Sequence, residues 1–212
     1  MELTTSEELS RLRFLHDVNL KIAEAPGYDA AVQHVIAAFR YELGADCGEM
    51  WDLSPDGAQL VLTSLQHDGQ SEFRDLESGL RSKSTELGSG AVGMAWQSGK
   101  PCLSVGSAAP VSIDSLHDTQ SRATDQRILL AIPIRCEGDL TSVIGLHVLD
   151  PPHQSRLDRL LSIESELGGY LRRKWEDQDA QFAAVIVEQS PTVLYRALAI
   201  DGAPRVSIRH PM

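Results

Sequence analysis

Apolar residues recur every three or four positions in the first part of the chain, a spacing typical of amphipathic helices. The first such period covers residues 5–22 and is interrupted by Pro26 and Gly27. A second period covers residues 29–42 and ends at Gly44, the residue type that most often follows the last turn of a helix. The pattern therefore predicts two consecutive N-terminal helices.

The hydrophobic pattern changes to that of strands after the second helix. Segments 50–53 and 59–63 flank a Ser-Pro-Asp-Gly turn and predict one hairpin. Segments 128–135 and 141–149 flank a polar Glu-Gly-Asp turn and predict a second. Because the second pair is apolar on both faces, we expect an antiparallel sheet that is covered on both sides.

A glycine-rich segment between the two hairpins contains the dinucleotide-binding pattern GxGxxG at Gly88, Gly90 and Gly93. A dinucleotide site also needs a buried apolar strand before the first glycine and a long helix after the last. Here polar residues precede Gly88, and Pro101 limits the following helix to about two turns. We therefore interpret these glycines as turn residues that allow positive φ.

Beyond the second hairpin, two prolines end the sheet and a helical pattern covers residues 154–188. Gly168 and Gly169 are a weak point within this helix. We predict one long C-terminal helix.

Composition narrows the classes of function. Of the 212 residues 42% are hydrophobic, which is enough for a core, and the net charge of −11 argues against a nucleic-acid partner. The three cysteines are widely spaced and form no CxxC pair, so we expect neither a disulfide framework nor a zinc site. No apolar run is long enough to span a membrane, and the N-terminus is acidic rather than signal-like. We expect a cytoplasmic protein with no membrane partner.

Four short motifs follow one another in a family-specific order: Leu-Gly-Ser-Gly at 87–90, Ser-Gly-Lys-Pro at 98–101, Ala-Ile-Pro-Ile at 131–134 and Val-Ile-Gly at 143–145. In this order they resemble a GAF domain over residues 28–173. The resemblance implies an α+β fold with an antiparallel sheet of about six strands. It also implies terminal helices on one face of the sheet and, on the other, a ligand pocket roofed by loops and a short helix.

The flanking segments complete the expected domain organisation. Residues 1–27 are expected to form an N-terminal signalling and dimerisation helix. Residues 174–212 are expected to be a linker helix followed by the start of a PAS domain, whose opening the tail resembles but which is too short for a PAS core. We therefore expect a homodimer that pairs through its terminal helices.

The function implied by the resemblance is that of a non-catalytic sensory module in a bacterial-type signalling protein, such as a two-component system. An effector such as a histidine kinase or diguanylate cyclase would lie outside this chain. The main alternative is a dimerisation scaffold that binds no ligand. A haem-binding gas or redox sensor is less favoured, and the cofactor stays unassigned.

Two enzymatic or chromophore-binding variants of the GAF fold do not match this sequence. Free methionine sulfoxide reductases place cysteines in the glycine turn and in the roof loop. Here Val92 stands in that turn, and no cysteine lies between Cys102 and Cys136. Bilin-binding domains attach the chromophore through a cysteine in the roof helix, often beside a histidine. Here no cysteine lies next to His117. We therefore predict no catalytic and no metal-binding residues.

The ligand site can be assigned only from residue type and position. Large apolar side chains near the sheet and the short helix either line the pocket or pack in the core. A histidine inside an apolar strand is a haem or metal ligand, or, more often, is hydrogen-bonded to a neighbour. The roof helix, expected at 113–120, adds two more candidates. The predicted ligand-binding residues are Met50, Trp51, Trp96, Leu116, His117 and His147.

Overall fold

The computed structural model describes residues 5–69, 73–105, 111–112, 127–189, 195–200 and 203–208. In chain order the elements are α1 (Thr5–Glu24), α2 (Tyr28–Leu43), β1 (Cys47–Leu53), β2 (Leu60–His67), α3 (Arg74–Ser78), β3 (Ser84–Thr85), α4 (Gly90–Ser98), β4 (Cys102–Val105), β5 (Val111–Ser112), β6 (Ile128–Cys136), β7 (Asp139–Val148), α6 (Gln154–Leu161), α7 (Glu164–Gln189), β8 (Tyr195–Ile200) and β9 (Ala203–Ile208). The roof helix expected at 113–120 lies outside the described residues.

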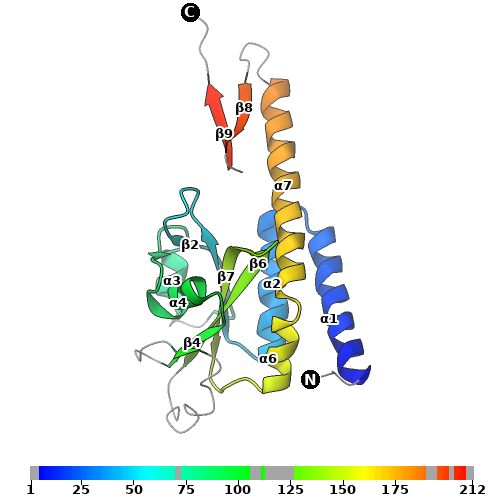
Figure 1. Cartoon of the computed structure of the whole chain (residues 1–212), viewed down its shortest axis with the longest axis vertical. Helices are drawn as coiled ribbons and strands as arrows, with labels where there is room; N and C mark the ends of the chain where they lie inside the picture. The colour runs from blue at the N-terminus through cyan, green and yellow to red at the C-terminus, as the bar shows by residue number, and fades with distance from the viewer. Residues whose placement is uncertain are drawn as a thin grey trace, which may run out of the picture.

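One antiparallel sheet organises the described residues (Figure 1). It has seven strands in the order β3-β2-β1-β7-β6-β4-β5, of which β3 and β5 are two residues long. Both predicted hairpins, β1–β2 and β6–β7, are present. Glu137 and Gly138 both have positive φ, at 54° and 93°, as the two-residue turn between β6 and β7 requires. The predicted α+β fold is confirmed.

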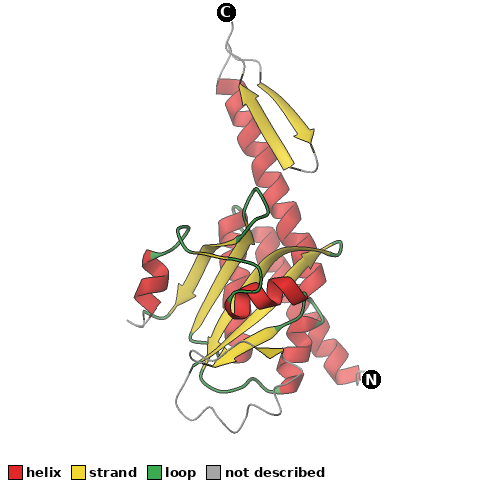
Figure 2. Cartoon of the chain, turned by 60° about the vertical axis from the view of Figure 1, so that its left-hand side comes forward, coloured by secondary structure: helices red, strands yellow, loops and turns green. Residues whose placement is uncertain are grey.

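Helices cover one face of the sheet, where the main core lies (Figure 2). Ile36 and Phe39 of α2 and Leu146 of β7 are each 0% exposed in this core. Helix α1 contributes to the same core, because Val18 is buried and the Phe14 ring lies 6.5 Å from that of Phe39. The expected placement of the terminal helices on a single face is therefore observed.

The C-terminal helix differs from the prediction of one continuous element. It breaks between α6 and α7, where the Ile163 N–H bonds to the Leu160 carbonyl in a tighter turn that places Ile163 fully inside the core. Gly168, by contrast, does not break α7. A Cβ on Gly168 would overlap the backbone carbonyl of Arg135, so glycine allows α7 to lie close to β6.

The C-terminal strands β8 and β9 form a hairpin separate from the main sheet. Because the hairpin is only two strands, the expected start of a PAS domain remains a prediction. None of the helices in the described part of the chain is long and apolar enough to cross a membrane.

Candidate functional site

The face of the sheet opposite the helical layer carries a second, smaller core beneath α4. Its buried members are Trp51, Leu60, Leu62, Ala91, Val92, Ala95, Cys102, Ala131 and Val143. The two cores on opposite faces explain why the strands of the second hairpin are apolar throughout. This second face is where the resemblance places a ligand pocket.

The glycine turn before α4 shapes this face and lacks the buried parallel strand and long helix that flank a GxGxxG dinucleotide site. The strand before it, β3, is a short edge strand antiparallel to β2. Gly88 and Gly90 have positive φ, and a Cβ on Gly93 would meet the backbone oxygen of Glu86. The three glycines therefore allow a tight turn from an edge strand into a nine-residue helix.

Beside this core, β1 and β7 bring three polar side chains together on the same face. Glu49 is only 1% exposed, and its carboxylate contacts two side chains. The Trp51 Nε1–H donates to Oε2 at 2.6 Å, and His147 Nε2 lies 2.5 Å from Oε1. Burial of a carboxylate is unfavourable unless it is hydrogen-bonded or paired, and these contacts supply that compensation.

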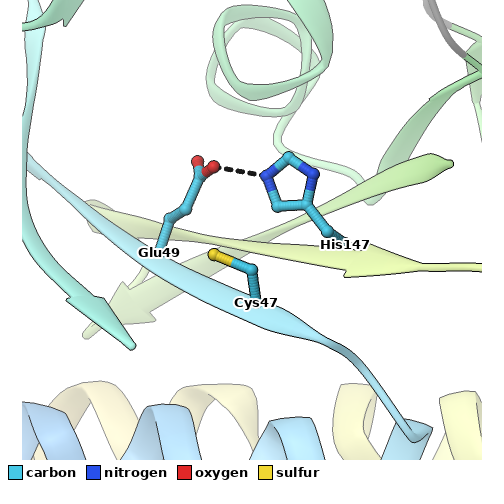
Figure 3. A group of neighbouring side chains, drawn as sticks. All are labelled: Cys47, Glu49 and His147. Carbon is cyan, nitrogen blue, oxygen red and sulfur yellow. Dashed lines mark hydrogen bonds and ion pairs between the residues drawn. The ribbon is translucent and has the colours of Figure 1, made fainter. Parts of the chain in front are cut away.

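The thiol of Cys47 belongs to the same cluster (Figure 3). Cys47 precedes Glu49 by two residues, so both side chains point to the same face of β1, and Cys47 is the direct cross-strand partner of His147. Donor atoms of Cys47, Glu49 and His147 all lie within 4.8 Å of one another. Burial and the Glu49 charge raise the pKa of the Cys47 thiol to about 12, so the free thiol is protonated at neutral pH.

Gly145 makes room for the Glu49 carboxylate. It is the β7 partner directly opposite Glu49 on β1. A Cβ at this position would lie 2.9 Å from Glu49 Oε2 and 3.3 Å from Leu129 Cδ1. The glycine of the Val-Ile-Gly motif therefore allows a charged side chain to lie flat on a tightly packed sheet.

Phe73 covers one side of the cluster. Its ring centroid lies 5.1 Å from that of His147, at an interplanar angle of 62°, and 5.6 Å from that of His67. The guanidinium of Arg127 lies 5.1 Å from the Phe73 ring centroid and is ion-paired with Asp46. The cluster is thus bounded by an aromatic ring that a cation holds in place.

The structure separates the residues predicted to line the ligand site. Trp51 and His147 lie on the face opposite the helices, and Trp96 on α4 is half-buried against the smaller core. Met50 is 0% exposed and packs in the main core, because it alternates with Trp51 and faces the helices instead. Met50 therefore does not face this cluster. Leu116 and His117 lie outside the described residues.

Sequence reasoning missed Cys47, Glu49 and Phe73. One signal was available for Glu49, since an acidic residue within a strand that is otherwise apolar at its buried positions needs a partner. The partner itself could not be found, because Glu49 and His147 are 98 residues apart in sequence.

A groove of about 410 Å³ lies along α7, beside the turn between β6 and β7. Glu137, Glu166 and Arg173 are among the residues that line it. It lies at the opposite end of β6 and β7 from His147, because Cys136 pairs with Asp139 whereas His147 pairs with Leu129. The groove and the polar cluster are therefore separate features.

No family model and no curated protein matches the chain, but solved structures do. The GAF domain of a phosphoenolpyruvate-protein phosphotransferase from Coxiella burnetii is 16% identical, with a TM-score of 0.58 over 82% of this chain and 98% of that one. The corresponding Acinetobacter domain is 14% identical, with a TM-score of 0.55 over 83% and 96%. Free methionine-R-sulfoxide reductase from Neisseria meningitidis, in complex with its substrate, is 15% identical, with a TM-score of 0.52 over 85% and 96%. The chain therefore has the fold of GAF domains.

Proposed function

We propose that the chain is a non-catalytic sensory module that binds a small molecule on the sheet face opposite the helical layer. The observation that carries the proposal is the buried Glu49–His147 pair, which lies on the face where the resemblance to GAF domains implies a ligand pocket. A GAF fold supports a regulatory or sensory role, although the Neisseria neighbour is an enzyme.

The chemistry of the cluster favours a small polar ligand. Ligand sites are mostly apolar, with a few well-placed polar groups that fix orientation. Here Trp51 and Phe73 supply apolar surface, and Glu49 and His147 supply hydrogen-bonding groups. The carboxylate can accept N–H or O–H donors from a ligand that displaces His147. Trp96 of α4 would contribute to the wall of the site.

The strands that carry the cluster offer a path for signal relay. On β7, His147 faces the cluster while Leu146 and Val148 pack in the main core against the helices. In the helical layer β7 packs on α2, whereas its neighbour β6 packs on α7. Movement of β7 on ligand binding would therefore reach α7 through β6, and the C-terminal part of α7 leads away from the sheet (Figure 1). The output would belong to a partner or to a further domain of a cytoplasmic bacterial-type signalling protein.

The described cysteines support a non-catalytic role. Cys102 and Cys136 are buried at 1% and 5% exposure, and Val92 stands in the glycine turn. Cys47 is fully buried, and its raised pKa keeps it from being a thiolate nucleophile at neutral pH. An assay for reduction of free methionine sulfoxide tests this part of the proposal, and no turnover above a blank is expected.

A thermal-shift screen tests ligand binding. Cyclic nucleotides, haem, amino acids and nitrate are added to the full chain, and a ligand that binds only the folded state raises Tm. We expect at least one hit, whose shift is lost in Glu49→Gln and kept in Glu137→Gln, a matched change in the distant β6–β7 turn. A screen without hits, or a shift that survives Glu49→Gln, contradicts the proposed site.

A specific observation also favours the alternative, a dimerisation scaffold. Leu9, Leu12 and Leu20 of α1 are 46–49% exposed and follow one another at helical spacing on one side of the helix. Trp175 of α7 is 45% exposed as well. Sedimentation equilibrium tests this candidate. The scaffold predicts a wild-type dimer that Leu12→Glu converts to a folded monomer, and a wild-type monomer at high concentration contradicts it.

A further inference from the structure

The cluster on β1 and β7 contains three different kinds of metal ligand. Cys47 offers a thiol sulfur, Glu49 a carboxylate oxygen and His147 an imidazole nitrogen. Calcium and magnesium sites are built from oxygen atoms alone, whereas mixed sulfur, nitrogen and oxygen sites suit zinc and its neighbours in the first transition series. The ligand set therefore indicates a borderline transition metal.

The backbone fixes the spacing of these three groups. Cys47 and His147 are cross-strand partners, and Glu49 follows Cys47 on the same face of β1 (Figure 3). Donor atoms around a tetrahedral zinc ion are roughly 3.3–3.6 Å apart. Here His147 Nε2 and Glu49 Oε1 are 2.5 Å apart, and all three donor atoms lie within 4.8 Å of one another. To surround one ion, the side chains would have to rotate so that Nε2 and Oε1 move apart to this spacing.

Two further features fit a metal site better than a simple ion pair. The Cys47 thiol is 0% exposed and points toward the pair. The Trp51 Nε1–H holds Glu49 Oε2, so Oε1, the oxygen in contact with His147, is the one that would face a metal. Partners of this kind orient the ligands of metal sites and are important for affinity.

We propose that Cys47, Glu49 and His147 bind one divalent transition-metal ion of the zinc class, with Trp51 as a positioning residue for Glu49. Three protein ligands leave a fourth coordination position for water or a small molecule. The inference shares residues with the proposed ligand site but does not rest on it, because the ion can bind whether or not an organic ligand does.

Cobalt titration of the tag-free full chain, after chelator treatment, tests the proposal. Cobalt(II) replaces zinc in such sites, and a thiolate ligand gives it a charge-transfer absorption in the near ultraviolet. We expect this absorption to saturate at one equivalent and to disappear when Zn²⁺ is added. Cys47→Ala should lose it, and Glu49→Gln and His147→Gln should bind cobalt at least roughly 10-fold more weakly.

Cys102→Ala is the matched control, because Cys102 is also a buried strand cysteine facing the second core but lies on β4. It should keep the wild-type spectrum and affinity. Absence of the thiolate absorption in the folded wild-type chain overturns the proposal whatever the variants do. An unchanged spectrum in Cys47→Ala, or its loss in Cys102→Ala, overturns it too.

Trp51→Phe tests the positioning role separately. We expect it to keep the thiolate absorption but to bind cobalt about 10–100-fold more weakly, because Glu49 loses the contact that orients it. A purely structural role for Trp51 would lower Tm and leave the cobalt affinity unchanged. A ligand hit that persists in the presence of chelator, together with absent cobalt binding, would reject the metal site and keep the small-molecule site.

Discussion

Replacement of His147 by alanine is expected to destabilise the metal-free chain more than the lost side-chain contacts alone would suggest. The side chains of Glu49 and His147 are only 2% and 16% exposed, and the substitution would leave a buried carboxylate with the Trp51 N–H as its remaining partner. Removal of one member of a buried pair costs about 3–5 kcal/mol. For a chain of this size that lowers Tm by roughly 6–20 °C.

The double variant Glu49→Gln/His147→Ala separates the charge effect from the packing effect. It has no buried charge, so its loss should be smaller than that of His147→Ala alone, at roughly 1–3 kcal/mol. Urea unfolding followed by circular dichroism, with chelator present, gives the free energies. His16→Ala, at an exposed position of α1, is the control and should change stability by less than about 0.5 kcal/mol. A double variant less stable than His147→Ala would refute the reasoning.

Three further predictions concern glycine packing and pH. Gly168→Ala should destabilise the folded chain by about 1–3 kcal/mol, because the added Cβ would overlap the Arg135 carbonyl. Gly169→Ala is the control in the same urea assay. Its Cβ would meet only a side-chain atom of Arg173 at 3.7 Å, so it should be neutral or stabilising. Gly145→Ala should shift the Glu49 carboxylate and also cost about 1–3 kcal/mol, and a neutral result would contradict the close packing on β7. Above pH 9 the unfolded Cys47 thiol ionises, whereas in the metal-free folded chain it stays protonated to about pH 12, so with chelator present stability should fall as the pH rises through this window. The fall should be less steep in Cys47→Ala, and equal slopes would contradict the assignment.

The main features of the fold could be predicted because they depend on local patterns. The two hairpins follow from strand periodicity and turn residues, and the glycine turn before α4 follows from its polar approach and short helix. The break between α6 and α7 could not be predicted in this way. The residues at the break, Ser162 and Ile163, are not helix breakers such as proline or glycine. The break follows instead from burial of Ile163 in the core, which is a tertiary effect.

The candidate site was predictable only in part. Trp51 and His147 were identified by residue type, but the sequence does not say which of two consecutive strand residues faces the helices, so Met50 was grouped with Trp51. Cys47 and Glu49 join His147 only because β1 pairs with β7, a pairing between segments about a hundred residues apart. For the same reason the wide spacing of the cysteines hid a metal-ligand set that contains only one of them.

The central claim is that the face of β1 and β7 opposite the helices is a binding site and that Cys47, Glu49 and His147 form it. X-ray absorption spectroscopy of the zinc-loaded chain tests this most directly, because it reports the atoms bound to the ion. The account predicts one sulfur at about 2.3 Å together with nitrogen and oxygen ligands at about 2.0–2.1 Å. A shell without sulfur, a shell with two or more sulfurs, or a chain that retains no zinc would contradict it.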